Sequence, residues 1–316
     1  MIRHTYFYAL LVLILCFSCS KDDGEDGDIG NPSNDFKGRI LYTSVGGTVY
    51  DLDMRTGIQK VYFTYNTYGF NGWSLSPDGQ YRLTSERDTG NYTESHFILL
   101  RADNGNIVKE FQYSPPLGNQ TDQAGSLSPD NTMIMIEPDL ENGIVVVDLQ
   151  GQVLHQFERV NDMVIDIGDE AVWMPDNSIL FTLEDRYILR TQPPYTQIDL
   201  IKEMPSTDWG NINLSPDGES LSMYYNNHIF ILDLESGELV QVTDSEEVES
   251  YAKFSPDGRY LLVGANFISY LGHLDLFAVP NDGKVHHLYK DDTAIKIQPE
   301  NDNLNARAFG PVFWAE

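Results

Sequence analysis

A proline turn that recurs five times constrains the fold of this chain more than any other feature. The turns contain Pro77, Pro129, Pro175, Pro216 and Pro256, and they follow one another 40 to 52 residues apart. In the fullest version, Ser-Pro-Asp-Gly, the proline presets φ at the second position. The aspartate can hydrogen-bond nearby backbone, and the glycine takes the left-handed conformation. Each turn is therefore predicted to join two adjacent antiparallel strands.

One complete repeat lies between the last two turns. A short apolar strand that ends at Leu214 leads into the fourth turn. Predicted strands at 220–225, 228–234 and 238–243 follow before the pattern restarts at Phe254. Four strands that meander and then repeat are typical of a propeller blade. The preceding repeat departs from the pattern, because Pro193-Pro194 replaces its second, Gly-containing turn.

The two ends of the chain are predicted to share the sixth blade. The first repeat, with strands expected at 39–44, 48–53 and 58–63, lacks an opening strand, whereas residues 309–315 align with the opening strand before the fifth turn. This alignment places Phe313 opposite Phe254. Pairing the two ends closes the ring and leaves no free sheet edge. We therefore predict an all-β, six-bladed β-propeller over residues 36–316, closed by N- and C-terminal strands in one blade.

The repeat Phe-Ser-Pro-Asp-Gly followed by an apolar strand is similar to the WD40-like (PD40) repeat of TolB-type six-bladed propellers. The resemblance covers nearly all of residues 36–316, and it implies the fold rather than a function. The chain departs from TolB in that only a tether fits between Cys19 and Gly38, where TolB carries a separate domain. Similar propellers precede the catalytic domain of prolyl-oligopeptidase-like peptidases, but this sequence has no Gly-x-Ser-x-Gly nucleophile elbow.

Residues 1–18 are predicted to be a lipoprotein signal peptide. Arg3 and His4 precede an apolar run that is too short to span a bilayer comfortably. The small residue Ser18 stands before Cys19, as in bacterial lipoprotein signals, although Cys16 and Phe17 depart from that pattern. The resemblance implies a lipid on Cys19 as the only membrane attachment. The alternative is an ordinary secreted protein with a solvated acidic tail.

Residues 19–35 are polar, acidic and rich in glycine, which predicts a flexible tether. The run Ser20-Lys21-Asp22-Asp23 resembles the acidic tag that exports some lipoproteins to the outer face of the outer membrane. We therefore expect a lipid-anchored outer-membrane protein that is exposed at the cell surface.

Composition and spacing exclude several classes of function. The net charge of −28 argues against binding of DNA or RNA, which requires basic patches for the phosphates. Cys16 and Cys19 are the only cysteines, so the propeller has no thiol for a disulfide, a zinc site or a nucleophile. The seven histidines form no metal-binding motif, and no glycine-rich phosphate loop is present. We expect no metal and no cofactor.

The loops between blades, and those between the second and third strands of each blade, share one face of a propeller. Here they are long and carry aromatic rings among Asp, Asn and Gly, which suits binding of a sugar or a protein loop. The position five residues before each turn proline is expected near the pore. The candidate ligand-binding residues are Tyr68, Phe70, Tyr92, Glu170, Trp209, Asn211 and Tyr251. The alternative is that individual rings plug the blade interfaces.

The sequence favours a non-catalytic binding protein that holds an envelope protein or a surface glycan on this long-loop face. Its basis is a complete propeller without a recognisable nucleophile, metal set or cofactor loop. A second hypothesis is a polysaccharide-active enzyme, lyase-like, with its site at the pore. The resemblance suggests it, because some related propellers are lyases with a histidine-rich metal site in the pore, but the scattered histidines of this chain disfavour it. A third is a structural accessory of an envelope machine.

Overall fold

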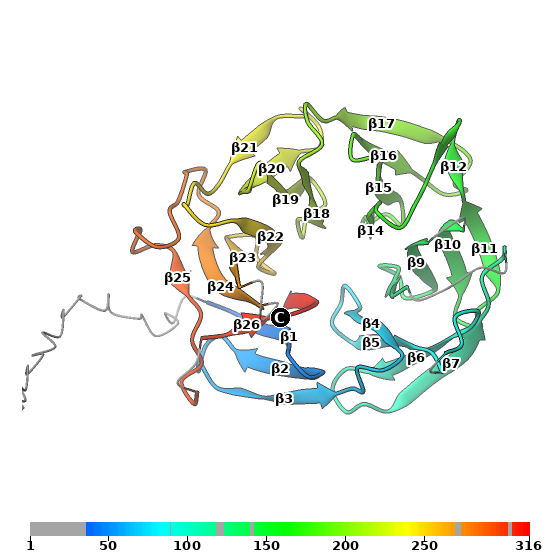
Figure 1. The fold of residues 1–316 in the computed structure, drawn as a ribbon, viewed down its shortest axis with the longest axis horizontal. Coiled ribbons are helices and arrows are strands. Elements are labelled where there is room, and N and C mark those ends of the chain that lie inside the picture. The colour runs from blue at the N-terminus through cyan, green and yellow to red at the C-terminus, as the bar shows by residue number, and fades with distance from the viewer. Residues whose placement is uncertain (1–35, 89, 118–122, 140–141, 269–272, 303–304) are drawn as a thin grey trace, which may run out of the picture.

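The chain forms a wheel of six antiparallel sheets around a central axis (Figure 1). The computed structural model describes residues 36–88, 90–117, 123–139, 142–268, 273–302 and 305–316. Across these ranges the ordered elements are strands, and no helix is long and apolar enough to cross a membrane. The predicted six-bladed β-propeller is therefore confirmed. The predicted signal peptide, Cys19 and the tether lie outside the described residues.

The first three blades follow one another from the N-terminus, each with its innermost strand named first. Blade 1 contains β27 (Val312–Ala315), β1 (Arg39–Ser44), β2 (Thr48–Asp53) and β3 (Gln59–Thr64). Blade 2 contains β4 (Phe70–Leu75), β5 (Tyr81–Glu86), β6 (Ser95–Arg101) and β7 (Ile107–Tyr113). Blade 3 contains β8 (Gly125–Leu127), β9 (Met133–Asp139), β10 (Gly143–Asp148) and β11 (Val153–Phe157).

The remaining blades repeat the same order with small additions. The ribbon β12 (Arg159–Val160) and β13 (Met163–Val164) leads into blade 4, which contains β14 (Ala171–Trp173), β15 (Ile179–Leu183), β16 (Tyr187–Thr191) and β17 (Ile198–Glu203). Blade 5 contains β18 (Trp209–Leu214), β19 (Ser220–Tyr225), β20 (His228–Asp233) and β21 (Leu239–Gln241). Blade 6 contains β22 (Glu249–Phe254), β23 (Tyr260–Ile268), β24 (His273–Pro280), β25 (Ile295–Lys296) and β26 (Arg307–Ala308).

The C-terminal strand closes the ring as the sequence predicts. β27 pairs antiparallel with β1, which places Phe313 opposite Leu41 and Trp314 opposite Ile40. It thereby supplies the innermost strand that the first repeat lacks. β1 is therefore paired with β27 on one side and with β2 on the other, so neither of its edges is left unpaired. Blade 4 is complete as well, although it carries Pro193-Pro194 in place of the glycine turn.

The proline turns owe their shape to a repeated side-chain network. In the first of them, the Ser76 hydroxyl donates to Asp78 at 2.6 Å and accepts from the backbone N–H of Tyr81 at 2.9 Å. Gly79 has φ of 67°, in the left-handed region that glycine tolerates. Equivalent contacts recur at Ser128, Ser215 and Ser255. The turn chemistry expected from the sequence is therefore confirmed.

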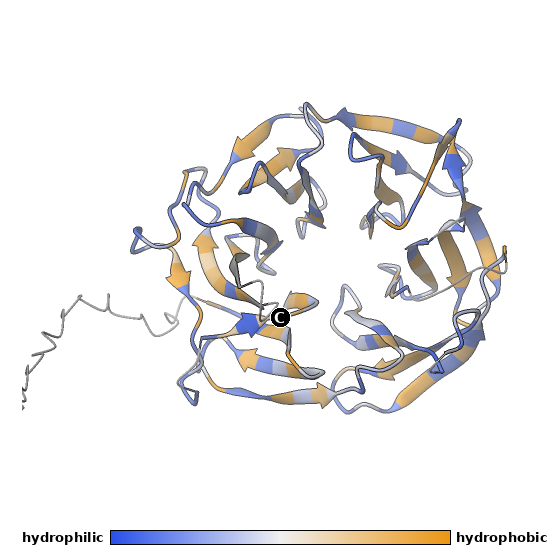
Figure 2. Cartoon of the chain, viewed as in Figure 1, coloured by the Kyte–Doolittle hydropathy of each residue, from blue (hydrophilic) through white to orange (hydrophobic). Residues whose placement is uncertain are grey.

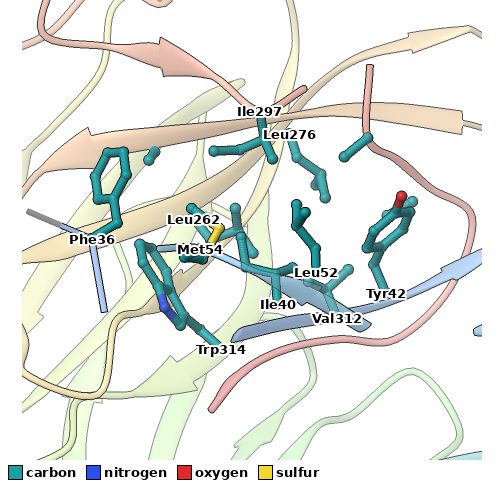
Figure 3. Packing of buried hydrophobic residues seen from close by; sticks show 13 residues of the cluster. Phe36, Ile40, Tyr42, Leu52, Met54, Leu262, Leu276, Ile297, Val312 and Trp314 are labelled. Carbon is teal, nitrogen blue, oxygen red and sulfur yellow. The ribbon is translucent and has the colours of Figure 1, made fainter. Parts of the chain in front are cut away.

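The core is divided into six apolar clusters, one at each interface between neighbouring blades. Hydrophobic residues concentrate along the strands, and the connecting loops are mostly polar (Figure 2). At the interface of blades 6 and 1, Leu262 and Leu276 pack with Ile40, and Trp314 and Phe36 cover one end of the cluster (Figure 3). The terminal strand is thus held by side-chain packing as well as by its backbone ladder.

Candidate functional site

A channel runs along the propeller axis. Three cavities of about 530, 780 and 600 Å³ lie around the axis, and Lys253 and Phe313 line all three. The first opens among residues of the long-loop side, such as Glu170 and Asn211. The second lies at the opposite end, where the five turn prolines surround it. Because Lys253 and Phe313 line all three, the cavities adjoin one another at these side chains, and together they are called the channel here.

The positions five residues before the turn prolines line this channel, as the sequence predicts. Glu170, Asn211 and Tyr251 border the cavity on the long-loop side, and Gly72 and Ala124 border the third cavity. β-Bulges interrupt β4, β18 and β22 near this level. A bulge redirects side chains at a strand end and is common beside functional sites. The structure therefore brings three of the predicted candidates together.

Glu170 also joins two blades. Its Oε1 accepts from the backbone N–H of Asn211 at 2.6 Å, and its Oε2 accepts from that of Ile212 at 2.9 Å. Asn211 has φ of 53°, and its side-chain amide donates to the carbonyl oxygen of Ser250 at 2.8 Å. Blades 4, 5 and 6 are thus connected at the channel rim. Burial raises the pKa of Glu170, although the two N–H donors and Lys253 oppose that rise.

Two charged residues of the channel, Lys253 and Glu137, were missed by the sequence interpretation. Lys253 lies on β22 three residues before Pro256, and Glu137 lies on β9. Residues alternate between the two faces of a strand, so positions five and three before a proline share a face. The alignment that selected Tyr251 could therefore have found Lys253. No equivalent signal marks Glu137.

These two side chains have unusual electrostatics. Desolvation by the channel walls lowers the pKa of Lys253 to about 8, against the attraction of Glu170 and Glu137. Channel solvent reaches Glu137, but the surrounding walls and the charge of Glu170 raise the pKa of its carboxyl group. The Lys253 ammonium lies 5.6 Å from the centre of the Phe313 ring, within reach of a cation–π contact.

Asp169 adds a further carboxylate at the wall of the first cavity. Burial raises its pKa to about 6, and the negative charges of Asp185 and Asp166 contribute. Its oxygens accept from the backbone N–H groups of Asp166 at 2.9 Å and Glu184 at 3.0 Å, which opposes the rise. The long-loop end of blade 4 is therefore an acidic edge of the channel.

The aromatic candidates occupy different environments. Phe70 stacks on Tyr65 with ring centres 3.8 Å apart, and both rings line the third cavity. Tyr68 is 78% exposed on the same loop but does not border a described cavity. Tyr92 is partly exposed under the guanidinium of Arg87, 4.4 Å from its ring centre. Of the three candidate rings Tyr68, Phe70 and Tyr92, Phe70 is the one that lines a channel cavity.

Trp209 belongs to the core rather than to the binding face. It is only 4% exposed, packs in the cluster between blades 4 and 5, and donates its indole N–H to the carbonyl oxygen of Asp185 at 2.6 Å. Its ring therefore plugs a blade interface, which is the alternative that the sequence left open. Tyr251 is partly buried as well. Its ring covers Gly264, where a Cβ would come within 2.4 Å of a ring carbon.

Among the described residues, no group of three or more His, Cys, Asp and Glu is arranged to hold a metal ion. What the channel offers instead is a cation, two or more carboxylates, amide groups and aromatic rings. Such a set can bind and orient a ligand through hydrogen bonds and stacking.

The comparisons with known proteins bear on this geometry. No protein-family model matches the chain, and no curated protein matches it at significant similarity. TolB from Acinetobacter baumannii has a similar structure, with a TM-score of 0.60, 21% identity, and coverage of 79% of this chain and 62% of that one. A protein described as TolB from Agrobacterium tumefaciens gives a TM-score of 0.53 and 15% identity over 78% of this chain and 86% of that one.

The chain has the fold of a TolB-like β-propeller. The family resemblance drawn from the Ser-Pro-Asp-Gly turns is therefore confirmed at the level of the fold. The chain spans less than two thirds of the length of the Acinetobacter protein. Within this TolB-like propeller, the channel residues named above are the candidates for ligand binding.

Proposed function

We propose that this protein is a non-catalytic binding propeller that holds a protein or glycan ligand at the long-loop end of its channel. The observation that carries the proposal is the channel itself. Its cavities converge on Lys253, whose ammonium group makes no hydrogen bond or ion pair with another described residue. Charged and aromatic side chains that converge in a concave site without partners are typical of ligand recognition.

The proposal also covers the location of the protein. A lipid on Cys19 would attach it to the outer membrane, and the acidic tether of residues 19–35 would hold the propeller away from the bilayer at the cell surface. Supporting this are the short apolar run, Ser18 before Cys19, and the acidic Ser20-Lys21-Asp22-Asp23 run.

Metabolic labelling with a palmitate analogue tests the anchor. The Cys19→Ala variant should lose both the label and membrane association, whereas the matched variant Cys16→Ala should keep both. Labelling that survives Cys19→Ala would refute the anchor. Digestion of intact cells with a protease tests exposure: the propeller should be cleaved in cells that carry the native sequence and protected once Lys21, Asp22 and Asp23 are replaced by alanine.

Capture from envelope extracts tests the binding role. The full chain and the Lys253→Met/Glu137→Gln variant are immobilised side by side, and the eluted proteins and glycans are compared. At least one species should bind to the native chain and be lost from the channel variant. A control variant, Tyr289→Ala, alters a partly exposed ring that lines none of the described cavities and should retain it. An identical set of bound species on all three would contradict the proposal.

One observation favours the second candidate, a polysaccharide-active enzyme of the lyase type. With a pKa of about 8, about a tenth of Lys253 is neutral at pH 7 and able in that form to accept a proton. A general base beside carboxylates in an open channel is compatible with β-elimination from a uronate sugar. Formation of unsaturated product from a uronate polysaccharide, lost in Lys253→Met, would establish this activity and overturn the non-catalytic role.

A further inference from the structure

Two opposite charges face the channel without forming a pair. Neither the ammonium group of Lys253 nor the carboxylate of Glu137 makes a hydrogen bond, or an ion pair within 4 Å, with another described residue. They nevertheless interact electrostatically, since each shifts the pKa of the other. Three N–H donors on one side and two acceptor oxygens on the other therefore remain for a ligand.

The presence of both a positive and a negative group restricts the charge that a ligand can carry. An anionic group that binds Lys253 is repelled by Glu137 and Glu170, and a cationic group that binds Glu137 is repelled by Lys253. A hydroxyl group satisfies both residues, because it can donate a proton to a carboxylate and accept one from an ammonium group. A neutral ligand with several hydroxyl groups thus fits the polar side of the channel.

An aromatic wall lies beside Lys253 and Glu137. It consists of Tyr65, Phe70, Phe309 and Phe313, which line the cavity of about 600 Å³ together with Lys253 and Glu137. Phe309 is 56% exposed, and Tyr65 and Phe70 stack face to face. A sugar ring has an apolar face of C–H groups and a polar rim of hydroxyls. Its two parts match the aromatic wall and the polar pair, respectively.

The inner edges of the blades are poorly suited to a peptide that would bind by strand addition. Such binding needs free backbone groups along an edge strand. On β18, Glu170 already occupies the N–H groups of Asn211 and Ile212. Side chains of neighbouring blades occupy the carbonyl oxygens of four inner-strand or adjoining residues, namely Gly125, Ser126, Ser250 and Ala252. Recognition in the channel therefore depends on side chains.

We propose that the channel binds a neutral oligosaccharide, with a sugar ring stacked on the aromatic wall and its hydroxyl groups bridging Glu137 and Lys253. This inference rests on the proposed binding function and identifies the ligand class of the same site. No bond of the ligand is formed or broken. Water that solvates the two charged groups is displaced by hydroxyls that reproduce its hydrogen bonds.

Titration calorimetry with the full chain tests the inference. The neutral probes are oligomers of glucose, mannose, galactose and xylose. The charged probes are oligomers of galacturonate and glucosamine, and a library of unstructured decapeptides represents proteins. At least one neutral oligomer should bind. Phe309→Ala, Lys253→Met and Glu137→Ala should each weaken that binding by about tenfold or more. The matched aromatic variant Tyr289→Ala should leave it unchanged.

The outcomes separate this inference from the proposed function. Binding of peptides or charged oligomers alone, weakened by Lys253→Met, would overturn the neutral sugar while leaving a channel ligand in place. If a neutral oligomer binds the Phe309, Lys253 and Glu137 variants as tightly as the native chain, the binding site proposed here would be refuted. An absence of binding for every probe would overturn the inference, and the capture experiment would then decide the proposed function. Circular dichroism of each variant confirms that the propeller is folded.

Discussion

The carboxylate of Glu170 accepts a hydrogen bond of 2.6 Å from the backbone N–H of Asn211, and this contact joins blade 4 to blade 5 at the wall of the channel. The other oxygen of Glu170 accepts from Ile212. One side chain thus serves both the architecture and the lining of the candidate site. Asn211 continues the connection to blade 6 through Ser250.

Replacement of Glu170 by Gln should destabilise the propeller. The amide offers one acceptor oxygen where the carboxylate offers two, so one backbone N–H group loses its charge-assisted partner. We expect the free energy of unfolding to fall by about 1–3 kcal/mol in urea titrations. The matched variant is Glu137→Gln in the same channel, whose carboxylate makes no hydrogen bond with a described residue. Equal losses in the two variants would refute the structural role of Glu170.

The closing strand makes a second prediction. Trp314 stacks near Tyr260, meets Phe36 edge-on, and donates its indole N–H to the carbonyl oxygen of Lys37 at 2.8 Å. Trp314→Ala should lower the free energy of unfolding by about 3–5 kcal/mol, as expected for loss of a buried aromatic ring. The control, Tyr289→Ala, removes a partly exposed ring and should cost much less. A loss below about 1 kcal/mol for Trp314→Ala would mean that the strand is not integrated in blade 1.

Asp169 should titrate far above an ordinary aspartate. Its pKa of about 6 exceeds the unfolded value of 3.8, so the folded state binds an extra proton between these pH values. Asp169 therefore lowers the free energy of unfolding as the pH rises through that window. Carbon NMR should give the pKa directly, and Asp185→Asn should lower it by removing a repulsive charge. An unchanged pKa in that variant would contradict the assigned cause.

Lys253 makes a prediction of opposite sign. Its pKa of about 8 lies below the unfolded value of 10.5, so the unfolded chain binds the extra proton between these pH values. The free energy of unfolding should therefore gain a contribution as the pH rises from 8 to 10.5. Urea titrations at both ends of this window should show a smaller gain in Lys253→Met than in the native chain. The exposed control Lys284→Met should match the native chain, and a gain that is equal in all three would place Lys253 in ordinary solvent.

The fold was predictable because its signals are local and repeated. The Ser-Pro-Asp-Gly turns depend on hydrogen bonds within five residues, and their recurrence specifies the blades. Residues 39–44, 48–53 and 220–225 form strands with the predicted bounds. The pairing of β27 with β1 followed from counting strands in the first and last repeats. Blade 4 also has four strands in the same order, although Pro193-Pro194 replaces its glycine turn.

The site was less predictable because the exposure of a side chain depends on how all six blades pack together. Trp209 lies in a loop-proximal position like Phe70, yet one ring is buried between blades and the other faces the channel. Lys253 could have been found by strand alternation. Glu137 comes from β9 of blade 3 and Lys253 from β22 of blade 6, so the two residues line the same cavities only because the blades close into a ring.

Blocking the channel tests the central claim, that the ligand is held inside the wheel, most directly. In a chain with Cys16 and Cys19 replaced by serine, a single cysteine is placed either at Asn213, which lines the channel, or at Lys284, an exposed turn residue. Both variants are labelled with the same bulky maleimide, and binding of the captured ligand is measured before and after labelling. We predict that labelling at residue 213 abolishes binding, whereas labelling at residue 284 leaves it unchanged. Full binding by the chain labelled at residue 213 would contradict the account.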